Sequence, residues 1–179
     1  MKQVELHAVF CYNFVMGKKN EKTAEKTNVM RLLEQAKISY EEFTYGSEVG
    51  TNGVDVAHAL GQDVTHVYKT LVTTGKSGAH YVFVVPVAEE LDLKKAASSV
   101  GEKAIEMLKS KELLPLTGYI HGGCSPIGMK KFFTTTVHST AKDQEYMMFS
   151  GGRIGYQVKV APGDLEKMIR LTYADITVR

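Results

Sequence analysis

Two adjacent apolar segments, at 66–75 and 80–87, place the strongest constraint on how this chain can fold. Their sequences, HVYKTLVTTG and HYVFVVPV, are rich in β-branched and aromatic residues and are joined by the turn-rich GKSG, so they predict neighbouring strands. Apolar residues recur at helical spacing on both sides of this strand pair, at 27–36 and at 93–100. A strand pair flanked by amphipathic helices predicts an α/β or α+β fold, in which helices pack on a mixed sheet.

The same two periodicities predict the remaining elements. Thr27 is placed to cap the first helix, and Gly61 is placed to end a short helix that begins at Gly53. Alternating segments predict strands at 38–45, 132–138, 145–150 and 156–161. Helical patterns predict three more helices, at 91–101, at 102–114 just before Pro115, and from Pro162 to about Leu171.

Length and composition describe an ordinary globular protein. The 179 residues suit one domain, and 22 basic against 20 acidic side chains leave a formal net charge of +2, which points to no particular partner. Cys11 and Cys124 lie far apart and match no metal-ligand spacing, and the six histidines match none either. We therefore expect no metal or other cofactor, and a location in the reducing cytoplasm.

The first 26 residues differ in pattern from the rest of the chain. Their apolar run, AVFCYNFVM, is too short and too polar to span a membrane, and no small-residue cleavage site follows it. We expect 1–26 to be a leader that is poorly ordered or foreign to the native protein, and 27–179 to form the domain. We expect no association with a membrane.

The segment GGCSPIG, at 122–128, raises the question of a nucleophile. Cys124 follows His121 by three positions, but a catalytic pair needs contact in space and a third, orienting group, and packed cysteines are more common. Ser125 precedes Pro126 and does not fit the G-x-S-x-G pattern of serine hydrolases. The alternative is a backbone cradle, in which the glycine pair lets N–H groups point at an anion or a carbonyl. A plain tight turn explains the segment equally well.

Two further features suggest binding chemistry. Lys69 lies on a mostly apolar strand face, where its ammonium either extends to water or meets a phosphate or hydroxyl of a ligand. The segment SGGRIG, at 150–155, is explained by a hairpin turn, yet it also offers a second glycine pair, the Ser150 hydroxyl and the Arg153 cation. This segment could form the wall of a pocket opposite 122–128.

Five segments carry a resemblance to a known family. They are VYKTL at 67–71, LDLKKAA at 91–97, TGYIHGGCSPIGMKK at 117–131, FSGGRIG at 149–155 and APGDLEKM at 161–168. In this order they resemble the YbaK/EbsC proteins, bacterial deacylases of mischarged Cys-tRNA-Pro that are related to the editing domain of prolyl-tRNA synthetases. The resemblance runs from about Thr27 to Arg179. It implies a single α/β domain around a mixed, partly barrel-like sheet, with a crevice for the aminoacylated 3′ end of tRNA.

The resemblance also implies a set of site residues. Those expected to act in catalysis are Lys69, Gly122, Gly123 and Ser150. Those expected to bind the substrate are Tyr45, Thr70, Ser125, Pro126, Gly128, Gly151, Gly152 and Arg153. The chain departs from the family at Cys124, where members usually carry Ile or Val, and this departure favours the backbone cradle over a thiol nucleophile. It departs again at Gln157, where many members have an acidic residue.

The implied activity is removal of cysteine from Cys-tRNA-Pro, and also from Cys-tRNA-Cys. No catalytic triad is needed, because the thiol of the aminoacyl cysteine attacks its own ester carbonyl. The expected partners are aminoacylated tRNA and prolyl-tRNA synthetase, and the protein is expected to be a monomer or a weak dimer. Two other functions stay open. One is an Ala-tRNA-Pro deacylase, which would have to position a water, and the other is a non-catalytic protein that binds tRNA acceptor ends or nucleotides.

Overall fold

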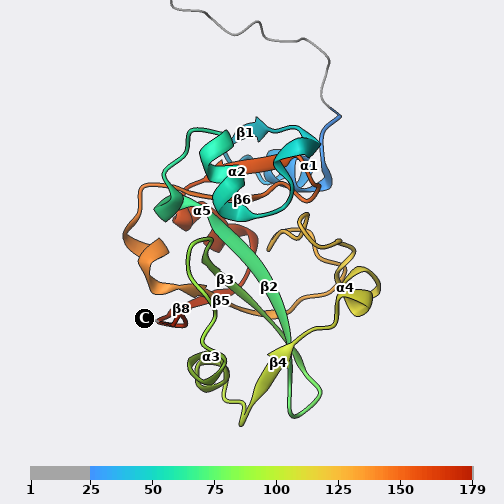
Figure 1. The fold of residues 1–179 in the computed structure, drawn as a ribbon, viewed down its shortest axis with the longest axis vertical. Coiled ribbons are helices and arrows are strands. Elements are labelled where there is room, and N and C mark those ends of the chain that lie inside the picture. The colour runs from blue at the N-terminus through green and yellow to red at the C-terminus, as the bar shows by residue number, and fades with distance from the viewer. Residues whose placement is uncertain (1–24, 179) are drawn as a thin grey trace, which may run out of the picture.

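The computed structural model describes residues 25–178 (Figure 1). The leader predicted at 1–26 lies outside the described residues except for its last two, so its boundary stays a prediction. The first helix, α1 (Asn28–Gln35), begins as predicted, because the Thr27 hydroxyl accepts a hydrogen bond of 3.3 Å from the Met30 backbone N–H. Its apolar side packs into the core through Val29, Met30 and Leu33.

The strands form two sheets, and every strand predicted from the sequence is present. The five-stranded sheet has the order β4-β2-β3-β5-β8, formed by Ile105–Met107, Tyr68–Gly75, His80–Pro86, Thr134–His138 and Leu171–Ala174. Its β3–β5 and β5–β8 pairs are parallel and its other pairs are antiparallel. The three-stranded antiparallel sheet has the order β1-β7-β6, formed by Glu41–Thr44, Tyr156–Val160 and Met147–Ser150.

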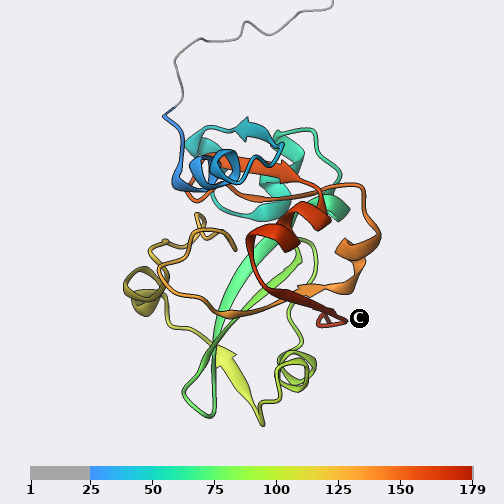
Figure 2. The ribbon, with the colours of Figure 1, turned by 180° about the vertical axis from the view of Figure 1, so that it is seen from behind.

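Four more helices cover these sheets. They are α2 (Gly53–Ala59), α3 (Leu93–Ser99), α4 (Ser110–Thr117) and α5 (Pro162–Met168). Figures 1 and 2 show that α1 and α2 lie beside the three-stranded sheet, whereas α3 and α4 lie along the five-stranded sheet. The predicted class, a mixed α/β domain, is therefore confirmed.

Two sequence predictions about helices were wrong. The helix expected at 102–114 is instead β4 followed by α4, and α4 contains Pro115. The apolar spacing of 105–108 suits either a helix or a short strand, and the choice is made by pairing with β2, which buries Ile105. The last helix ends at Met168 rather than near Leu171, because Leu171–Ala174 pairs with β5 as β8.

The outer edge of β2 is paired at both ends and open in the middle. At one end Val67 forms a parallel bridge with Met148 of β6, which joins the two sheets. At the other end Thr73–Gly75 pairs with β4. Within the described part of the chain, no strand pairs with Tyr68–Leu71 on this edge. The two sheets therefore do not close into a barrel, and the gap along β2 leaves room for a site.

The core on either side of this gap is apolar and holds β2 in place. One cluster joins α1 to the sheets through residues such as Tyr68, Val84 and Phe149, and another packs α2 against Val67 and Met148. Over residues 25–178, no helix is long and apolar enough to cross a membrane.

Candidate active site

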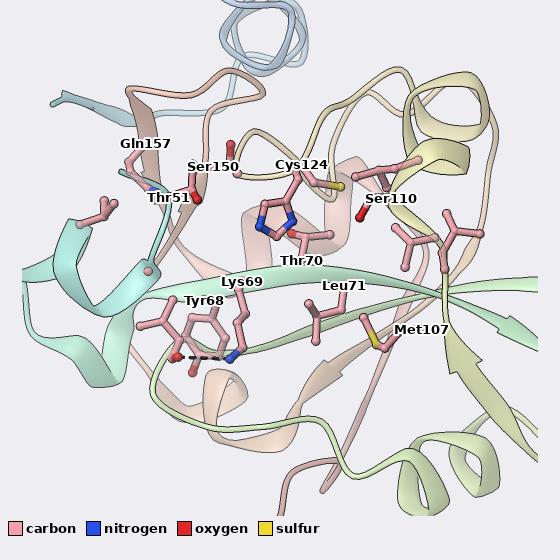
Figure 3. A pocket seen from close by; sticks show the side chains of 18 of the residues that line it. Thr51, Tyr68, Lys69, Thr70, Leu71, Met107, Ser110, Cys124, Ser150 and Gln157 are labelled. Atoms are coloured by element: carbon pink, nitrogen blue, oxygen red, sulfur yellow. Dashed lines mark hydrogen bonds between the residues drawn. The ribbon is translucent and has the colours of Figure 1, made fainter. Parts of the chain in front are cut away.

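The open edge of β2 faces a cavity of about 370 Å³, a size typical of small-molecule sites. Its other walls come from Thr51, from the segments 107–113 and 121–124, and from Ser150 and Gln157 of the three-stranded sheet (Figure 3). These segments are far apart in the sequence. They meet here because both sheets border the gap in the pairing of β2.

Lys69 is a half-buried cation in the wall of this cavity. Its Nζ donates one hydrogen bond of 3.2 Å to the carbonyl oxygen of Val87, which leaves further N–H donors for a ligand. Burial lowers the pKa of Lys69, and the nearby carboxylates of Glu89 and Glu90 oppose this shift. The site therefore holds a partly desolvated ammonium, which attracts anionic or electron-rich ligand groups strongly.

Two side chains in the wall carry buried oxygens without a hydrogen-bond partner. They are the hydroxyl of Thr70 and the amide oxygen of Gln157, and within residues 25–178 no other buried side-chain N or O lacks one. An unsatisfied buried polar group costs about 1–3 kcal/mol. Both groups are therefore candidates for contacts that a ligand would complete.

Gly122 shapes the wall opposite β2. Its φ is +81°, and a Cβ at this position would lie 2.3 Å from Cγ2 of Thr51, so only glycine fits without strain. Gly123 lies beside it and packs closely on the other glycine segment, because a Cβ at Gly123 would lie 3.2 Å from the backbone nitrogen of Ile154. The two glycine segments therefore lie against each other instead of facing each other across the cavity.

The predicted backbone donors are largely engaged within the protein. The N–H of Gly123 donates to the Ile120 carbonyl at 3.0 Å, that of Gly151 to the Tyr156 carbonyl at 2.9 Å, and that of Gly152 to the Ser150 hydroxyl at 3.2 Å. The cradle that these segments can offer is consequently smaller than the sequence suggested.

The structure brings some of the predicted residues together and separates others. Those that line the cavity are Tyr45, Lys69, Thr70, Gly122 and Ser150. Those that do not line it are Gly123, Ser125, Pro126, Gly128, Gly151, Gly152 and Arg153. Pro126 and Gly128 border a second hollow behind the 122–128 segment, and the buried Ser125 hydroxyl accepts from the Ile127 N–H at 3.4 Å. Arg153 is exposed and pairs with Glu25 at 3.6 Å.

Cys124 lines the cavity as a neutral, packed thiol. It is 9% exposed, and burial raises the pKa of its thiol to about 12. His121 also lines the cavity, but such a thiol is protonated at neutral pH and is a poor nucleophile. Within the described range, no three His, Cys, Asp or Glu side chains are placed to hold a metal ion. The chemistry available here is binding and positioning.

Sequence reasoning left Gln157 and Thr51 out of the site. Thr51 lies in a loop with no pattern of its own. Gln157 was noted in the sequence only as a departure from the family, and it reaches the cavity through the pairing of β7 with β1 and β6.

Comparisons with known proteins match the part of the chain that forms nearly the whole cavity. The model of the aminoacyl-tRNA editing domain family matches residues 48–168, which include every cavity residue except Tyr45. The EbsC protein of Enterococcus faecalis, described as a candidate Cys-tRNA(Pro)/Cys-tRNA(Cys) deacylase, is 42% identical over 165 residues. These residues cover 92% of this chain and 99% of that protein.

Solved structures share the fold at lower identity. A crystal structure described as a candidate trans-editing enzyme for prolyl tRNA synthetase matches with a TM-score of 0.73 and 23% identity, over 86% of this chain and 99% of that one. The crystal structure of a hypothetical protein matches with a TM-score of 0.76 and 19% identity, over 84% and 99%. By its family match and its full-length similarity to EbsC, the chain belongs to the aminoacyl-tRNA editing domain family.

Proposed function

We propose that this protein is a trans-editing deacylase that removes cysteine from Cys-tRNA(Pro), and also from Cys-tRNA(Cys). The observation that carries the proposal is the 42% identity, over nearly its whole length, to a protein described by that activity. The cavity supports it, because it offers a cation and polar binding groups but no ionised nucleophile among the described residues. A reaction in which the substrate attacks itself needs only such a site.

In the proposed reaction the cysteinyl thiol attacks the carbonyl carbon of its own ester. A sulfur–carbon bond forms, the ester carbon–oxygen bond breaks, and the thiol proton ends on the released ribose oxygen, so the product is a strained thiolactone. Holding the thiol in an attacking pose lowers the barrier by about 7–11 kcal/mol in favourable intramolecular cases. The narrow cavity between β2 and the 121–124 segment supplies that restraint.

The cavity residues take roles that follow from their positions. Lys69 binds a hydroxyl or phosphate of the terminal nucleotide, because its ammonium is partly desolvated and retains free N–H donors. Gly122 and Ser150 flank the ester from the other walls. A donor placed at the developing oxyanion is worth about 3–4 kcal/mol, and the Thr70 hydroxyl is free to act as one.

The test is release of amino acid from Cys-tRNA(Pro) under single-turnover conditions. We expect rapid loss of cysteine, much slower loss of alanine from Ala-tRNA(Pro), and no loss of a cysteine whose thiol is methylated. Equal rates of cysteine and alanine release would contradict attack by the substrate's own thiol and would indicate hydrolysis by a positioned water. Tight binding of charged tRNA without ester cleavage would identify a binding protein instead.

Prolyl-tRNA synthetase is the proposed partner in the cytoplasm. The proposal rests on the solved structure whose description links this fold to trans-editing for that synthetase. We expect added synthetase to raise the deacylation rate on tRNA(Pro) but not on tRNA(Cys). An equal effect on both tRNAs would contradict the partnership.

A further inference from the structure

Gln157 is a polar side chain held rigidly in the cavity wall. It lies on β7, the middle strand of the three-stranded sheet, where it pairs with Phe43 of β1 on one side and Ser150 of β6 on the other. The residue is 8% exposed. Pairing on both edges fixes its backbone, so the position of its amide depends only on side-chain rotation.

The sheet face that carries Gln157 is mixed: Phe43 and Ser150 lie beside it, and Met148 and the ion pair of Lys159 with Glu41 lie beyond them. Phe43 and Met148 lie on the same face and pack with Val67 and Val87 of the cluster around α2. The amide oxygen of Gln157 is nevertheless buried without a partner, because none of these neighbours donates a hydrogen bond to it, and such a group is unfavourable. A local conflict of this kind is typical of functional positions.

A cysteinyl ester brings one group that demands an acceptor in this cavity. Its α-ammonium carries several N–H donors and is costly to bury without partners. The wall formed by the described residues contains no Asp or Glu. Lys69 repels an ammonium, and Figure 3 shows its Nζ directed away from Gln157. On the side away from Lys69, the amide oxygen of Gln157 is a buried acceptor without a partner, and unlike a hydroxyl it can only accept.

We propose that Gln157 accepts a hydrogen bond from the α-amine of the aminoacyl group, and that the site thereby selects esters of amino acids with a free α-amine. This inference rests on the proposed function. Because an amide is uncharged, it accepts from –NH₂ as well as from –NH₃⁺, so the contact survives deprotonation of the amine. The Thr70 hydroxyl remains available for the ester or the ribose.

Binding of two non-hydrolysable ligands tests the inference. Each is an adenosine whose 3′-amino group carries an acyl chain in amide linkage: cysteine in the first, and 3-mercaptopropionic acid, which lacks the α-amine, in the second. For the wild type, removal of the amine should weaken binding roughly tenfold to a hundredfold, the range of a hydrogen bond to a charged group. Gln157→Met should weaken the cysteinyl ligand by a similar factor and leave the second ligand unchanged.

Gln157→Glu is the matched control, since it keeps an acceptor of the same length. It should bind the cysteinyl ligand at least as tightly as the wild type, and it carries the test if Gln157→Met does not fold. Equal wild-type affinity for both ligands, or equal weakening of both by Gln157→Met, would overturn the inference. Because binding needs no hydrolysis, a protein that binds as expected without deacylating would refute the proposed function alone.

Discussion

The two long walls of the cavity are built in different ways. The β2 wall is a strand paired with β3 along its other edge, and it presents a cation and a hydroxyl with unused hydrogen-bonding capacity. The wall at 119–128 has no regular pairing among the described residues, and its Gly123 N–H is engaged within the wall. Tyr119 stabilises this wall, because its hydroxyl donates a hydrogen bond of 2.6 Å to the Ile127 carbonyl.

The two walls therefore have different roles, one in binding chemistry and one in the shape of the cavity. The β2 wall supplies the groups that interact with a ligand, and the loop wall supplies a surface of fixed form that depends on glycine at positive φ. We therefore expect changes in β2 to alter activity with little effect on stability, and changes in the loop to alter stability first. Three substitutions test this division.

Lys69→Met should have the largest effect, and on activity alone. Loss of a charge-assisted contact worth about 1.5–3 kcal/mol slows deacylation roughly ten- to a hundredfold. Stability should stay equal or rise, because a half-buried charge is replaced by an apolar chain of similar length. Single-turnover rates and thermal melting measure the two effects. Lys69→Arg, which keeps the charge, is the control and should retain more activity than Lys69→Met.

The pH dependence gives an independent check on the same residue. Since burial depresses the pKa of Lys69 in the folded state, the native protein releases this proton before the unfolded chain does. Stability therefore rises with pH between the folded and the unfolded pKa. The wild type should gain stability relative to Lys69→Met over that alkaline interval, and an opposite slope would contradict a desolvated Lys69.

The sequence predicted the β2 wall better than the loop wall, for a physical reason. An apolar strand pair has a clear pattern, so β2, β3 and the placement of Lys69 on the strand were predicted correctly. Glycine is ambiguous by comparison, because the same residue serves close ligand approach and close packing. Gly152, at φ +87°, proved to pack against Val29 and Tyr119, and it lies outside the cavity.

Pairing between distant segments explains the remaining errors. The patterns of 105–107 and 171–174 fit a helix locally, and only partners elsewhere in the chain make them strands. Gln157 joined the cavity for the same reason, since its neighbours Phe43 and Ser150 come from other strands. Tertiary context of this kind does not show in a local pattern.

Gly122→Ala should have the next largest effect, and mainly on stability. The left-handed φ of +81° is unfavourable for any side chain, and the new Cβ would meet Thr51, so we expect a loss of about 1–3 kcal/mol in unfolding free energy. Denaturant titration measures the loss. Gly163→Ala is the matched control: it lies in α5 with nothing within 4 Å of the new Cβ and should be neutral or slightly stabilising. Equal stability of the two variants would show that the loop wall adapts easily.

Cys124→Ala should have the smallest effect on both quantities. It removes one packed atom from the loop wall, so we expect a loss of about 1 kcal/mol in stability and an activity close to that of the wild type. The wild-type thiol should also resist alkylation at pH 8, since its pKa lies at about 12.

The alkaline stability of Cys124→Ala decides whether that thiol is as buried as the structure shows. The raised pKa means that the native state keeps a proton that the unfolded chain loses, so the wild type loses stability as pH rises from the usual thiol range towards 12. Cys124→Ala lacks this loss, and the gap between the two proteins should narrow and then reverse. An inactive but folded Cys124→Ala beside an active Lys69→Met would assign the chemistry to the loop wall and reverse the division of roles between the two walls.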